Sequence, residues 1–440
     1  MANTLIVGGT IIDGSGAPLR PATDVLLTGD RIHTIGTSAT EAANSLADLV
    51  RIDATGKTVM PGLIDAHTHV TLGEPASNDE LFFRREPASA AMIAAYNVPK
   101  LLRAGVTSFL DADGLFNIGP ALRDCINAGI VQGPTMKSGG YALMTAVGGT
   151  AGRLIPDEGT AGYAEVTHNR DEMVRAVRRQ IKEGVDCIKI HVTGSVPGRR
   201  GEFSVWKLDE LRAITETAHE LGAWVLGHCR STDSTLQAAH AGIDIIYHGS
   251  FLNEACVDAM AEAGSALCPT FTFLANLSEF GSKAGSEMAA LDWFRSEIEA
   301  TAEMTRLAFD RGVPLLCGTE TGFTVTPIGE WHAREMELFV RYLGLTPLEA
   351  IACGTRNGTI ATREQGETGE LKEGMRADVL VVDGDPSNDV TILQDKRNLL
   401  HVFCRGVDVD LTPIPSRANL PGERSMSWTA VPLTWGLAHS

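Results

Sequence analysis

The sequence predicts an α/β protein: a (β/α)8 TIM barrel joined to a small β-sandwich domain that is built from both ends of the chain. In residues 59–367, strand-like runs alternate with amphipathic helix-like segments, as a parallel β/α architecture requires. Eight such units fit within about 300 residues, the usual size of this barrel. Short strands separated by glycine turns stand before and after this region, in residues 1–58 and 368–410.

Composition describes an ordinary globular protein, with 44% hydrophobic residues, 46 glycines and 19 prolines in 440 residues. A net charge of −18 argues against a nucleic-acid partner, because phosphate binding needs clustered Lys and Arg. No apolar run approaches the roughly 18 residues of a membrane span, and the first residues lack a signal-peptide pattern. The eight cysteines are scattered without a CxxC pair. We therefore expect a cytoplasmic homo-oligomer that acts on a small molecule without nucleic acid or membrane.

The two ends of the chain read as β structure and are each too small to bury a core alone. Strands are expected at 4–13, 24–36, 49–52, 377–383 and 399–404. One composite domain from residues 1–58 and 368–410 would solve this problem. Residues 411–440 form a tail with little charge and two tryptophans, Trp428 and Trp435, so we expect it to pack on the protein or on a neighbouring subunit.

The barrel region, residues 59–367, contains one strand candidate for each of the eight units. These candidates are 63–69, 106–111, 134–140, 186–192, 223–228, 243–248, 265–270 and 313–318. The clearest amphipathic helices between them are 169–183, 208–221, 253–263 and 297–311. In a barrel of this kind the chemistry lies at the C-terminal ends of the strands.

The first barrel strand ends in a His-Thr-His triplet, after the breaker Pro61-Gly62 and the apolar run 63–66. Side chains at i and i+2 of a strand point the same way, so His67 and His69 would lie side by side. Two adjacent imidazoles suit a divalent metal, although an isolated HxH has an ordinary structural explanation more often than not.

Four further strand ends supply the missing ligand types. Lys189 stands between isoleucines in the fourth strand, where a lone cation must be paired, neutral or modified. His228 and His248 end the fifth and sixth strands, and Glu320 follows the eighth. A single strand-end histidine often just bonds a backbone carbonyl. Together with the HxH pair, these residues indicate a metal centre.

These motifs resemble the amidohydrolase superfamily, and within it the metal-dependent imidazolonepropionase- and prolidase-like group that includes ochratoxin-type, phenylurea and thiocarbamate hydrolases. The resemblance covers nearly the whole chain. Its most specific part is the stretch PGLIDAHTH, and the supporting motifs are IKI at 188–190, GHC at 227–229, YHG at 247–249 and GTE at 318–320.

The resemblance implies a binuclear centre, with His67 and His69 on one metal and His228 and His248 on the other. Lys189, carboxylated by CO2, would bridge the two metals. A metal-bridging hydroxide would attack the substrate, and Glu320 would act as the acid–base group, directly on the metal or beside it. Zinc is expected from the ligand types, with manganese and cobalt as alternatives.

The chain departs from this group at two places. The acid after strand eight is usually Asp in a GTD context and is Glu320 here. The histidine that prolidase-like members tend to carry after a Gly-Gly pair is replaced at Gly148-Gly149-Thr150. Both changes favour a non-peptide substrate and leave the metal ligands intact.

Three more residues are candidates for substrate binding. His191 shares the face of Lys189, and either lines the pocket or supports a ligand through a hydrogen bond. Arg230 follows His228 by two residues and would either hold a substrate carboxylate or carbonyl, or pair with Asp233. Tyr141 after strand three is the third candidate.

We therefore expect a binuclear metal-dependent amidohydrolase that cleaves a C–N bond of an amide, urea or carbamate. An N-acyl amino acid, a dipeptide or an aryl amide would suit it. The alternatives are a cyclic-amide hydrolase, a deaminase, or an inactive scaffold on the same fold. Loss of metal ligands would mark such a scaffold, and none is lost in this sequence.

Overall fold

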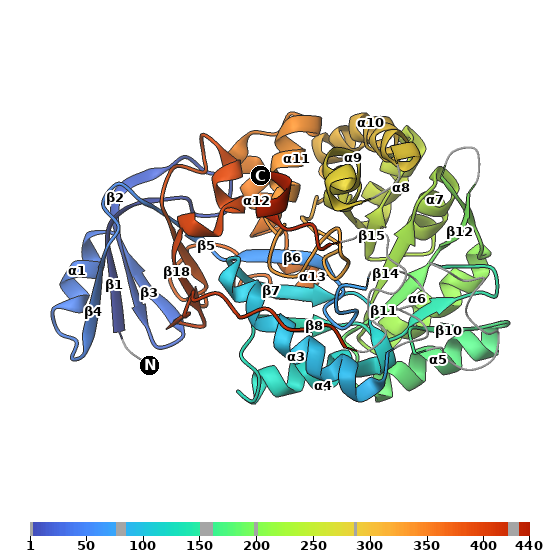
Figure 1. Cartoon of the computed structure of the whole chain (residues 1–440), viewed down its shortest axis with the longest axis horizontal. Coiled ribbons are helices and arrows are strands. Elements are labelled where there is room, and N and C mark those ends of the chain that lie inside the picture. The colour runs from blue at the N-terminus through green and yellow to red at the C-terminus, as the bar shows by residue number, and fades with distance from the viewer. Residues whose placement is uncertain (1–2, 76–84, 150–161, 198–200, 286–287, 421–430) are drawn as a thin grey trace.

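The computed structural model describes residues 3–75, 85–149, 162–197, 201–285, 288–420 and 431–440. A sheet made from the two ends of the chain lies on one side, and the strands and helices of the central region lie on the other (Figure 1). Within the described residues, no helix is both long and apolar enough to cross a membrane. The predicted tail residue Trp428 and Thr150 lie outside the described residues.

The terminal sheet has eight strands and joins both ends of the chain. They are β1 (Asn3–Ile11), β2 (Arg20–Thr28), β3 (Arg31–Ile35), β4 (Leu49–Asp53), β5 (Thr58–Pro61), β17 (Val379–Val382), β18 (Leu399–Cys404) and β19 (Val407–Asp408). The order is β19-β18-β17-β5-β1-β2-β3, with β4 beside β1. The antiparallel pair β5–β17, with Val59 opposite Val381, joins the two halves. The segment 24–36, expected as strand structure with a Gly-Asp turn, is two strands joined by a turn at residues 29–30.

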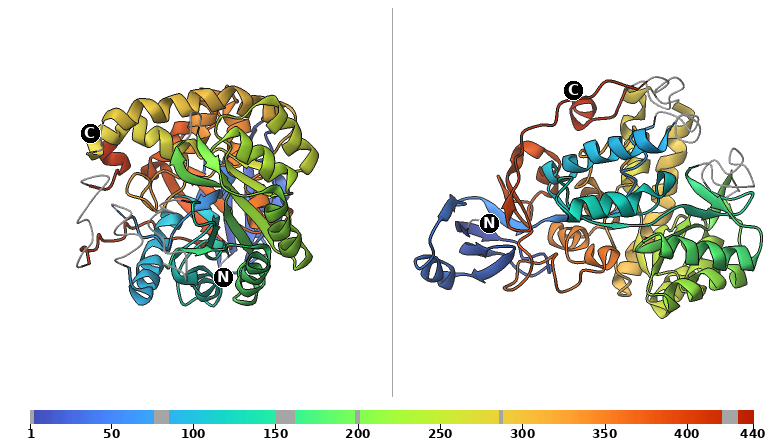
Figure 2. Two further views of the ribbon diagram at one scale, coloured as in Figure 1. Left: turned by 90° about the vertical axis from the view of Figure 1, so that its right-hand side faces the viewer. Right: turned by 90° about the horizontal axis from the view of Figure 1, so that it is seen from below.

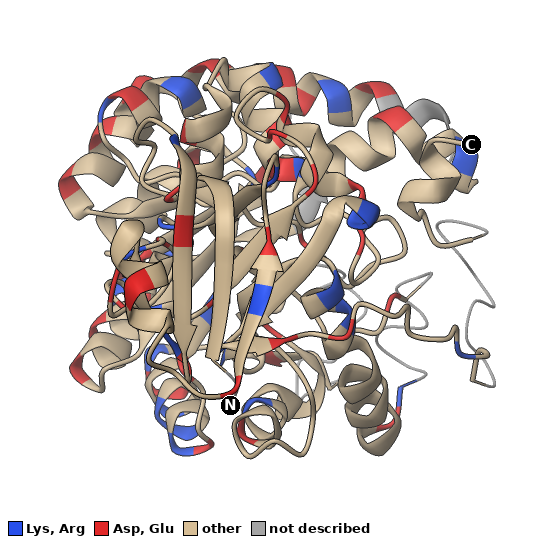
Figure 3. Ribbon diagram, turned by 90° about the vertical axis from the view of Figure 1, so that its left-hand side faces the viewer, with Lys and Arg blue, Asp and Glu red and all other residues tan. Residues whose placement is uncertain are grey.

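This sheet curls around an apolar interior. Residue Ile32 of β3 donates its N–H to the Met375 carbonyl, and Ala377 donates to the Asp30 carbonyl, so the far edge returns to the segment before β17. Inside lie aliphatic side chains such as Ile6 and Val379. Helix α1 (Thr37–Ala43) covers the other face. The eight terminal strands form one sheet. The expected two-sheet sandwich and the exact domain boundaries stay predictions. The strands facing the viewer in Figure 3 carry few charges compared with the surrounding helices.

The central region holds parallel strands in two groups. The first is β6 (Leu63–Thr68), β7 (Val106–Asp111) and β8 (Thr135–Ser138), and the second runs in the order β10 (Ala164–Val166), β9 (Ala142–Met144), β11 (Cys187–His191), β14 (Trp224–Cys229), β15 (Ile245–His248) and β16 (Ala266–Cys268). An antiparallel hairpin, β12 (Thr193–Pro197) and β13 (Glu202–Ser204), follows β11. The short strands β9, β10, β12 and β13 were not predicted, because their sequences lack strand periodicity.

Backbone hydrogen bonds connect the two groups at both ends. Asp186 before β11 donates to the Ser138 carbonyl of β8. At the other side, Leu316 donates to Leu267 of β16, and Ala66 of β6 donates to Cys317. The eighth predicted strand, 313–318, therefore lies between β16 and β6, although it forms isolated bridges rather than a regular ladder. The strand neighbours follow one another around a closed path.

Helices cover these strands on the outside (Figure 2). The described α-helices are α3 (Pro87–Arg103), α4 (Ile118–Asn127), α5 (Arg170–Lys182), α6 (Leu208–Glu220), α7 (Thr232–His240), α8 (Glu254–Ala263), α9 (Phe271–Phe280), α10 (Met288–Asp310), α11 (Arg334–Leu343), α12 (Pro347–Gly354), α13 (Thr359–Thr362) and α14 (Trp435–Ala438). Helix α5 shows why they form. Asn169 caps its first turn by accepting from Glu172 N, and Met173, Val177 and Gln180 face inward at helical spacing.

The strands put alternate residues on opposite sides, and this alternation positions the functional groups. In β11, Ile188 and Ile190 pack outward against the helices, whereas Cys187 joins the interior cluster with Tyr247. Lys189 has the same parity as Cys187 and therefore points into the interior.

The tail residues 431–440 contact the loop that follows Glu320. Leu433 donates its N–H to the Thr324 carbonyl, and Trp331 donates its indole N–H to the Leu433 carbonyl, at 2.8 Å each. Leu433 and Ala438 pack with Trp331 in one apolar cluster.

Candidate active site

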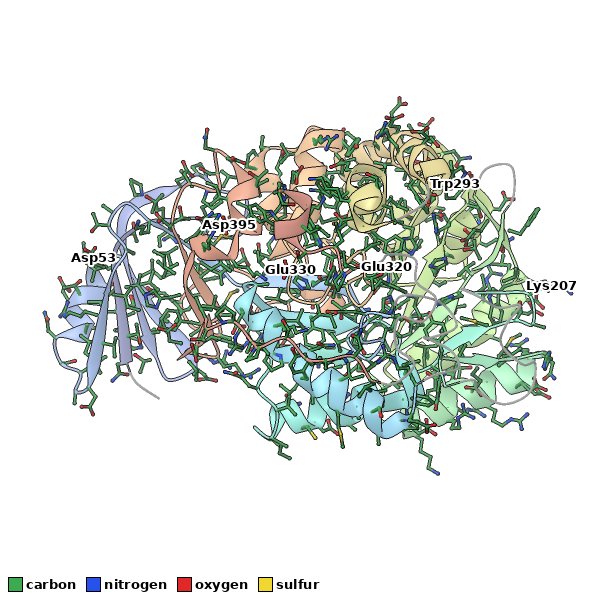
Figure 4. The ribbon with its side chains drawn as sticks, viewed as in Figure 1. Asp53, Lys207, Trp293, Glu320, Glu330 and Asp395 are labelled. Carbon is green, nitrogen blue, oxygen red and sulfur yellow. The ribbon has the colours of Figure 1, made fainter. Side chains whose placement is uncertain are left out.

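Six potential ligand residues meet at the ends of five strands. His67 lies in β6 and His69 just after it; Lys189 lies in β11, His228 in β14 and His248 at the end of β15. All five are buried, and Glu320, after the eighth predicted strand, is half-buried near the middle of the central region (Figure 4). Ligand atoms of His67, His248 and Glu320 lie within 4.8 Å of one another.

The environment of His67 leaves one ring nitrogen free. Nδ1 lies 3.0 Å from the Thr270 hydroxyl, which itself donates to the Cys268 carbonyl at 3.3 Å. Because that hydroxyl has only one proton, it accepts from Nδ1–H, and Nε2 keeps its lone pair. Nε2 is buried and has no hydrogen-bond partner among the described residues. A buried acceptor without a protein partner needs a partner of another kind, such as a metal ion.

The other histidines are oriented by carboxylates. Asp113 approaches Nδ1 of His69 with Oδ1 at 2.8 Å, and Glu202 approaches Nε2 of His228 with Oε2 at 3.3 Å. The Nδ1–H of His69 donates a hydrogen bond to the main-chain carbonyl of Asp113 at 3.1 Å, beside its carboxylate, and the Nε2–H of His228 donates to Glu202, so the other ring nitrogen of each histidine keeps its lone pair. This is how metal-binding histidines are fixed in one tautomer.

The remaining nitrogens converge as a divalent metal requires. Nδ1 of His228 lies 3.0 Å from Nε2 of His248. Two nitrogens bound tetrahedrally to one zinc at about 2.0–2.1 Å would lie about 3.3 Å apart. The donor set of imidazoles and a carboxylate also suits zinc, manganese or cobalt. The residues present therefore fit a divalent metal ion.

Lys189 is 1% exposed and has two balancing groups. Its Nζ lies 3.9 Å from Asp113 Oδ1 and 4.5 Å above the ring of Tyr247, which also stacks on His67. The buried ammonium is thus paired with an anion and an aromatic face.

Asp113 contacts both His69 and Lys189. The sequence did not lead us to expect this residue in the site. Its second oxygen lies 3.1 Å from His191 Nε2 and 3.2 Å from the Tyr163 hydroxyl. Asp113 comes two residues after β7, and carboxyl ends of parallel strands meet at one edge. The Asp-Ala-Asp-Gly run at 111–114 was therefore a usable signal.

Electrostatics keeps most of the potential ligands in the form that binds metal. Burial and the charge of Lys189 hold the pKa of His67 well below its usual range, and burial does the same for the pKa of His248. Metal binding requires neutral imidazole. Burial alone would lower the pKa of His69, but Asp113 outweighs it and raises that pKa. Burial raises the pKa of Glu320, as expected of a carboxyl that exchanges protons.

Three residues of the site have a left-handed backbone conformation. His248, Thr270 and Glu320 have positive φ angles of 66°, 56° and 54°. Such conformations cost non-glycine residues about 1–3 kcal/mol and gather at functional sites. The backbone at Gly318 lies so close to its neighbours that only glycine fits there. A Cβ would lie 2.4 Å from Cys268 Sγ and 2.7 Å from His67 Cβ.

The three predicted substrate-binding residues differ in their surroundings. His191 contacts Asp113 and stacks on His228 with ring centroids 4.9 Å apart, which is the supporting arrangement. Burial lowers the pKa of His191 to about 4. Tyr141 lines a surface pocket with Arg179 and Glu183, whereas Tyr163 is the tyrosine that reaches Asp113. The substrate roles of His191 and Tyr141 stay predictions.

Arg230 pairs with Glu297, a residue that sequence reasoning did not connect with it. Its Nη2 and Nε lie 2.7 and 3.1 Å from the two oxygens of the Glu297 carboxylate. Glu297 lies 67 positions further along the chain, so no local pattern could have revealed the pair. The expected alternative was a local pair with Asp233.

Comparison with known proteins identifies the family. Residues 58–409 match the amidohydrolase family model. Ochratoxinase of Aspergillus niger is 28% identical over 424 residues, covering 92% of this chain and 86% of that protein. Its crystal structure covers 92% of this chain and 95% of its own, with a TM-score of 0.78 and 26% identity. A Xaa-Pro dipeptidase with bound methionine covers 92% and 99%, with a TM-score of 0.79 and 25% identity.

Molinate hydrolase, at 23% identity and a TM-score of 0.76, covers 95% of this chain and 99% of its own and shares the fold. These neighbours imply an α/β fold of the TIM-barrel type. The resemblance seen in the sequence motifs is thereby confirmed: the chain belongs to the amidohydrolase family.

Proposed function

We propose that this protein is a metal-dependent hydrolase that cleaves a C–N bond of an amide, urea or carbamate. The observation that carries the proposal is the convergence of His67, His248 and Glu320 around the unpartnered Nε2 of His67. The relatives support it by the chemistry of their names, since ochratoxinase and Xaa-Pro dipeptidase are hydrolases.

In this proposal His67 and His69 hold one divalent ion, and His228 and His248 hold a second. Glu320 lies close enough to two of these histidines to be a ligand as well. When bound, such ions polarise a substrate carbonyl and increase the acidity of water. Zinc is the expected metal, with manganese and cobalt as alternatives.

The protein's own groups position the ligands and move the protons. Asp113, Glu202 and Thr270 hold three imidazole rings in fixed orientations. Glu320 accepts a proton from the attacking water at its carboxylate and donates a proton to the leaving nitrogen. Water adds to the carbonyl carbon, the C–N bond breaks, and the amine leaves with that proton.

Lys189 is proposed to carry a carbamate. Its uncharged amine would form an N–C bond with CO2 and release one proton, so that a buried cation becomes an anion with two ligand oxygens. Support comes from its position between the histidine pairs and from its burial. The nearby Asp113 implies that this anion forms only when metal charge is present to balance both carboxylates.

The proposal also covers the setting of the enzyme. All eight cysteines are free in the structure, which is compatible with a reducing compartment such as the cytoplasm. A homo-oligomer acting on a small-molecule substrate remains part of the proposal. So do the domain boundaries 58/59, 367/368 and 410/411.

The test is metal analysis of the purified protein together with a screen of N-acyl amino acids, aryl ureas and carbamates. Chelation should abolish hydrolysis, and zinc, cobalt or manganese should restore it. His67→Ala and His248→Ala should each lose metal and activity. His219→Ala is the matched control, because His219 pairs with Asp244 on the outside of the protein at 43% side-chain exposure. Full activity without metal would refute the proposal.

A further inference from the structure

The guanidinium of Arg230 is already occupied by protein carboxylates. Glu297 accepts two hydrogen bonds from it, at 2.7 and 3.1 Å, and Glu202 lies 3.8 Å from Nη1. A bidentate guanidinium–carboxylate pair is the strongest arrangement these groups form. Arg230 therefore presents a neutralised cation.

The carboxylate of Glu297 is held in place by its surroundings. It lies on α10, its side chain is 1% exposed, and Ser250 donates a hydrogen bond of 2.6 Å to it. A buried carboxylate with these partners cannot leave Arg230 without a large cost, because both charges would be left uncompensated. The pair is a fixed feature of the folded protein.

The pair lies at the edge of the candidate active site. Arg230 follows His228 by two residues, and Glu202 contacts both of them. The charge of Arg230 also lowers the pKa of Glu320, although burial outweighs it. On the outer side, the 44% exposed ring of Trp293 lies 5.6 Å from the guanidinium carbon (Figure 4).

We infer that Glu297 makes this site select substrates that are uncharged beside the scissile bond and discriminate against those with a carboxylate there. The inference rests on the proposed function and narrows it, favouring neutral amides, ureas and carbamates over N-acyl amino acids. Glu297 is thus a specificity-determining residue.

The physical reason is the difference between a free and a paired arginine. A free guanidinium near the reacting group would bind a substrate carboxylate through two charged hydrogen bonds. Here the same donors are taken by Glu297, so an incoming carboxylate would lose water without finding a free cation to pair with. Removing the charge of Glu297 should release the cation's attraction for anions, with an effect on the order of 10- to 100-fold in KM.

The test compares N-benzoylglycine with its neutral amide, by the ratio of kcat/KM for benzoyl release from the metal-loaded enzyme. Glu297→Gln keeps the shape and the Ser250 contact but removes the charge. The ratio should shift toward the acid by at least tenfold, through KM. Glu364→Gln is the matched control, because Glu364 forms a buried pair with Arg376 on the other side of the protein and should leave the ratio unchanged.

A double variant, Glu297→Gln with Arg230→Gln, tests whether Arg230 is neutralised by Glu297 or is free to bind a substrate anion. If Arg230 and Glu297 neutralise each other in the wild type, the double variant should have the wild-type ratio of kcat/KM for the acid and the amide. The shift toward the acid that Glu297→Gln alone produces should then be absent. If Arg230 is a free anchor, the double variant loses preference for the acid. That result, or an unchanged ratio in Glu297→Gln, overturns the inference. Since the double variant removes both charges together, it decides the question even if the single variant fails to fold.

Binding measurements keep this test separate from the proposed function. Calorimetric titrations with N-benzoylglycine and its neutral amide should show the same shifts in affinity in the same variants, also in a protein that hydrolyses neither compound. A protein that binds metal but hydrolyses no amide, urea or carbamate would refute the proposed function. The ratio of the affinities for N-benzoylglycine and its neutral amide would still decide the role of Glu297.

Discussion

Asp113 holds one carboxylate oxygen 2.8 Å from Nδ1 of His69, and the two residues follow different strands, β7 and β6. The same oxygen lies 3.9 Å from Nζ of Lys189. Burial would raise the pKa of Asp113, but Lys189 and His69 outweigh it and hold that pKa well below its usual range. One ionised group therefore orients a ligand and balances a buried cation.

Asp113→Asn should weaken metal binding by about 10- to 100-fold, because the Nδ1–H of His69 loses the carboxylate charge beside it that helps to fix its tautomer. The measurement is metal retention against a chelator of known affinity. Asp244→Asn is the control, since Asp244 supports His219 on the surface in the same manner. Equal metal affinity in Asp113→Asn and wild type would contradict the positioning role.

Lys189→Ala should be nearly inactive and should recover part of its activity with short carboxylic acids, which can replace a carbamate. In the metal-loaded wild type, a carbon-13 signal from labelled CO2 should mark the modified lysine, and removal of metal should abolish it. The second expectation follows from Asp113, whose charge opposes a second anion in the absence of metal. An unmodified amine in active, metal-loaded enzyme would refute the carbamate.

Glu320→Gln should retain its metal and lose roughly 10²–10⁴ in kcat, the usual contribution of a positioned acid–base group. Glu320→Asp should keep measurable activity, because it restores the acid common in the family. Metal content and a pH–rate profile of each variant are the measurements. Near-normal kcat of the Gln variant at every pH would reduce Glu320 to a supporting role.

The free energy of unfolding should depend on pH through the buried carboxyl of Glu335. Its carboxyl accepts from the N–H groups of Phe271 and Thr272 at the start of α9, and burial raises its pKa to about 7. The folded state therefore holds a proton that the unfolded state, with a pKa near 4.5, releases. The raised pKa of Glu335 therefore stabilises the folded state fully below pH 4.5. This contribution to the free energy of unfolding, about 3 kcal/mol, is lost as pH rises through 7.

The measurement is the free energy of unfolding between pH 4.5 and 8 for wild type and Glu335→Gln. The difference between the two proteins should change with pH in this window and be constant outside it. A pH-independent difference would show that Glu335 has an ordinary pKa in the folded protein.

The positions of the candidate ligands at the strand ends could be expected from local sequence pattern. His67 and His69 follow from the two-residue period of a strand, and Lys189 from its apolar neighbours in β11. Their meeting at one edge follows from the parallel order of β/α units. The region 313–318, expected as the eighth strand, forms only an isolated bridge to β16, and Gly318 in it lies too close to His67 and Cys268 for a Cβ.

The sequence by itself determined the family, the α/β class and the types of residue at the strand ends, because strand period and motif spacing are local properties. Only the tertiary structure decided which groups stand behind them: Asp113 behind His69, Glu202 behind His228 and Glu297 on Arg230. These partners come from segments 26 to 67 residues away, and many other acidic residues lie at similar separations. Packing brings one of them within bonding distance, and burial then makes that contact strong.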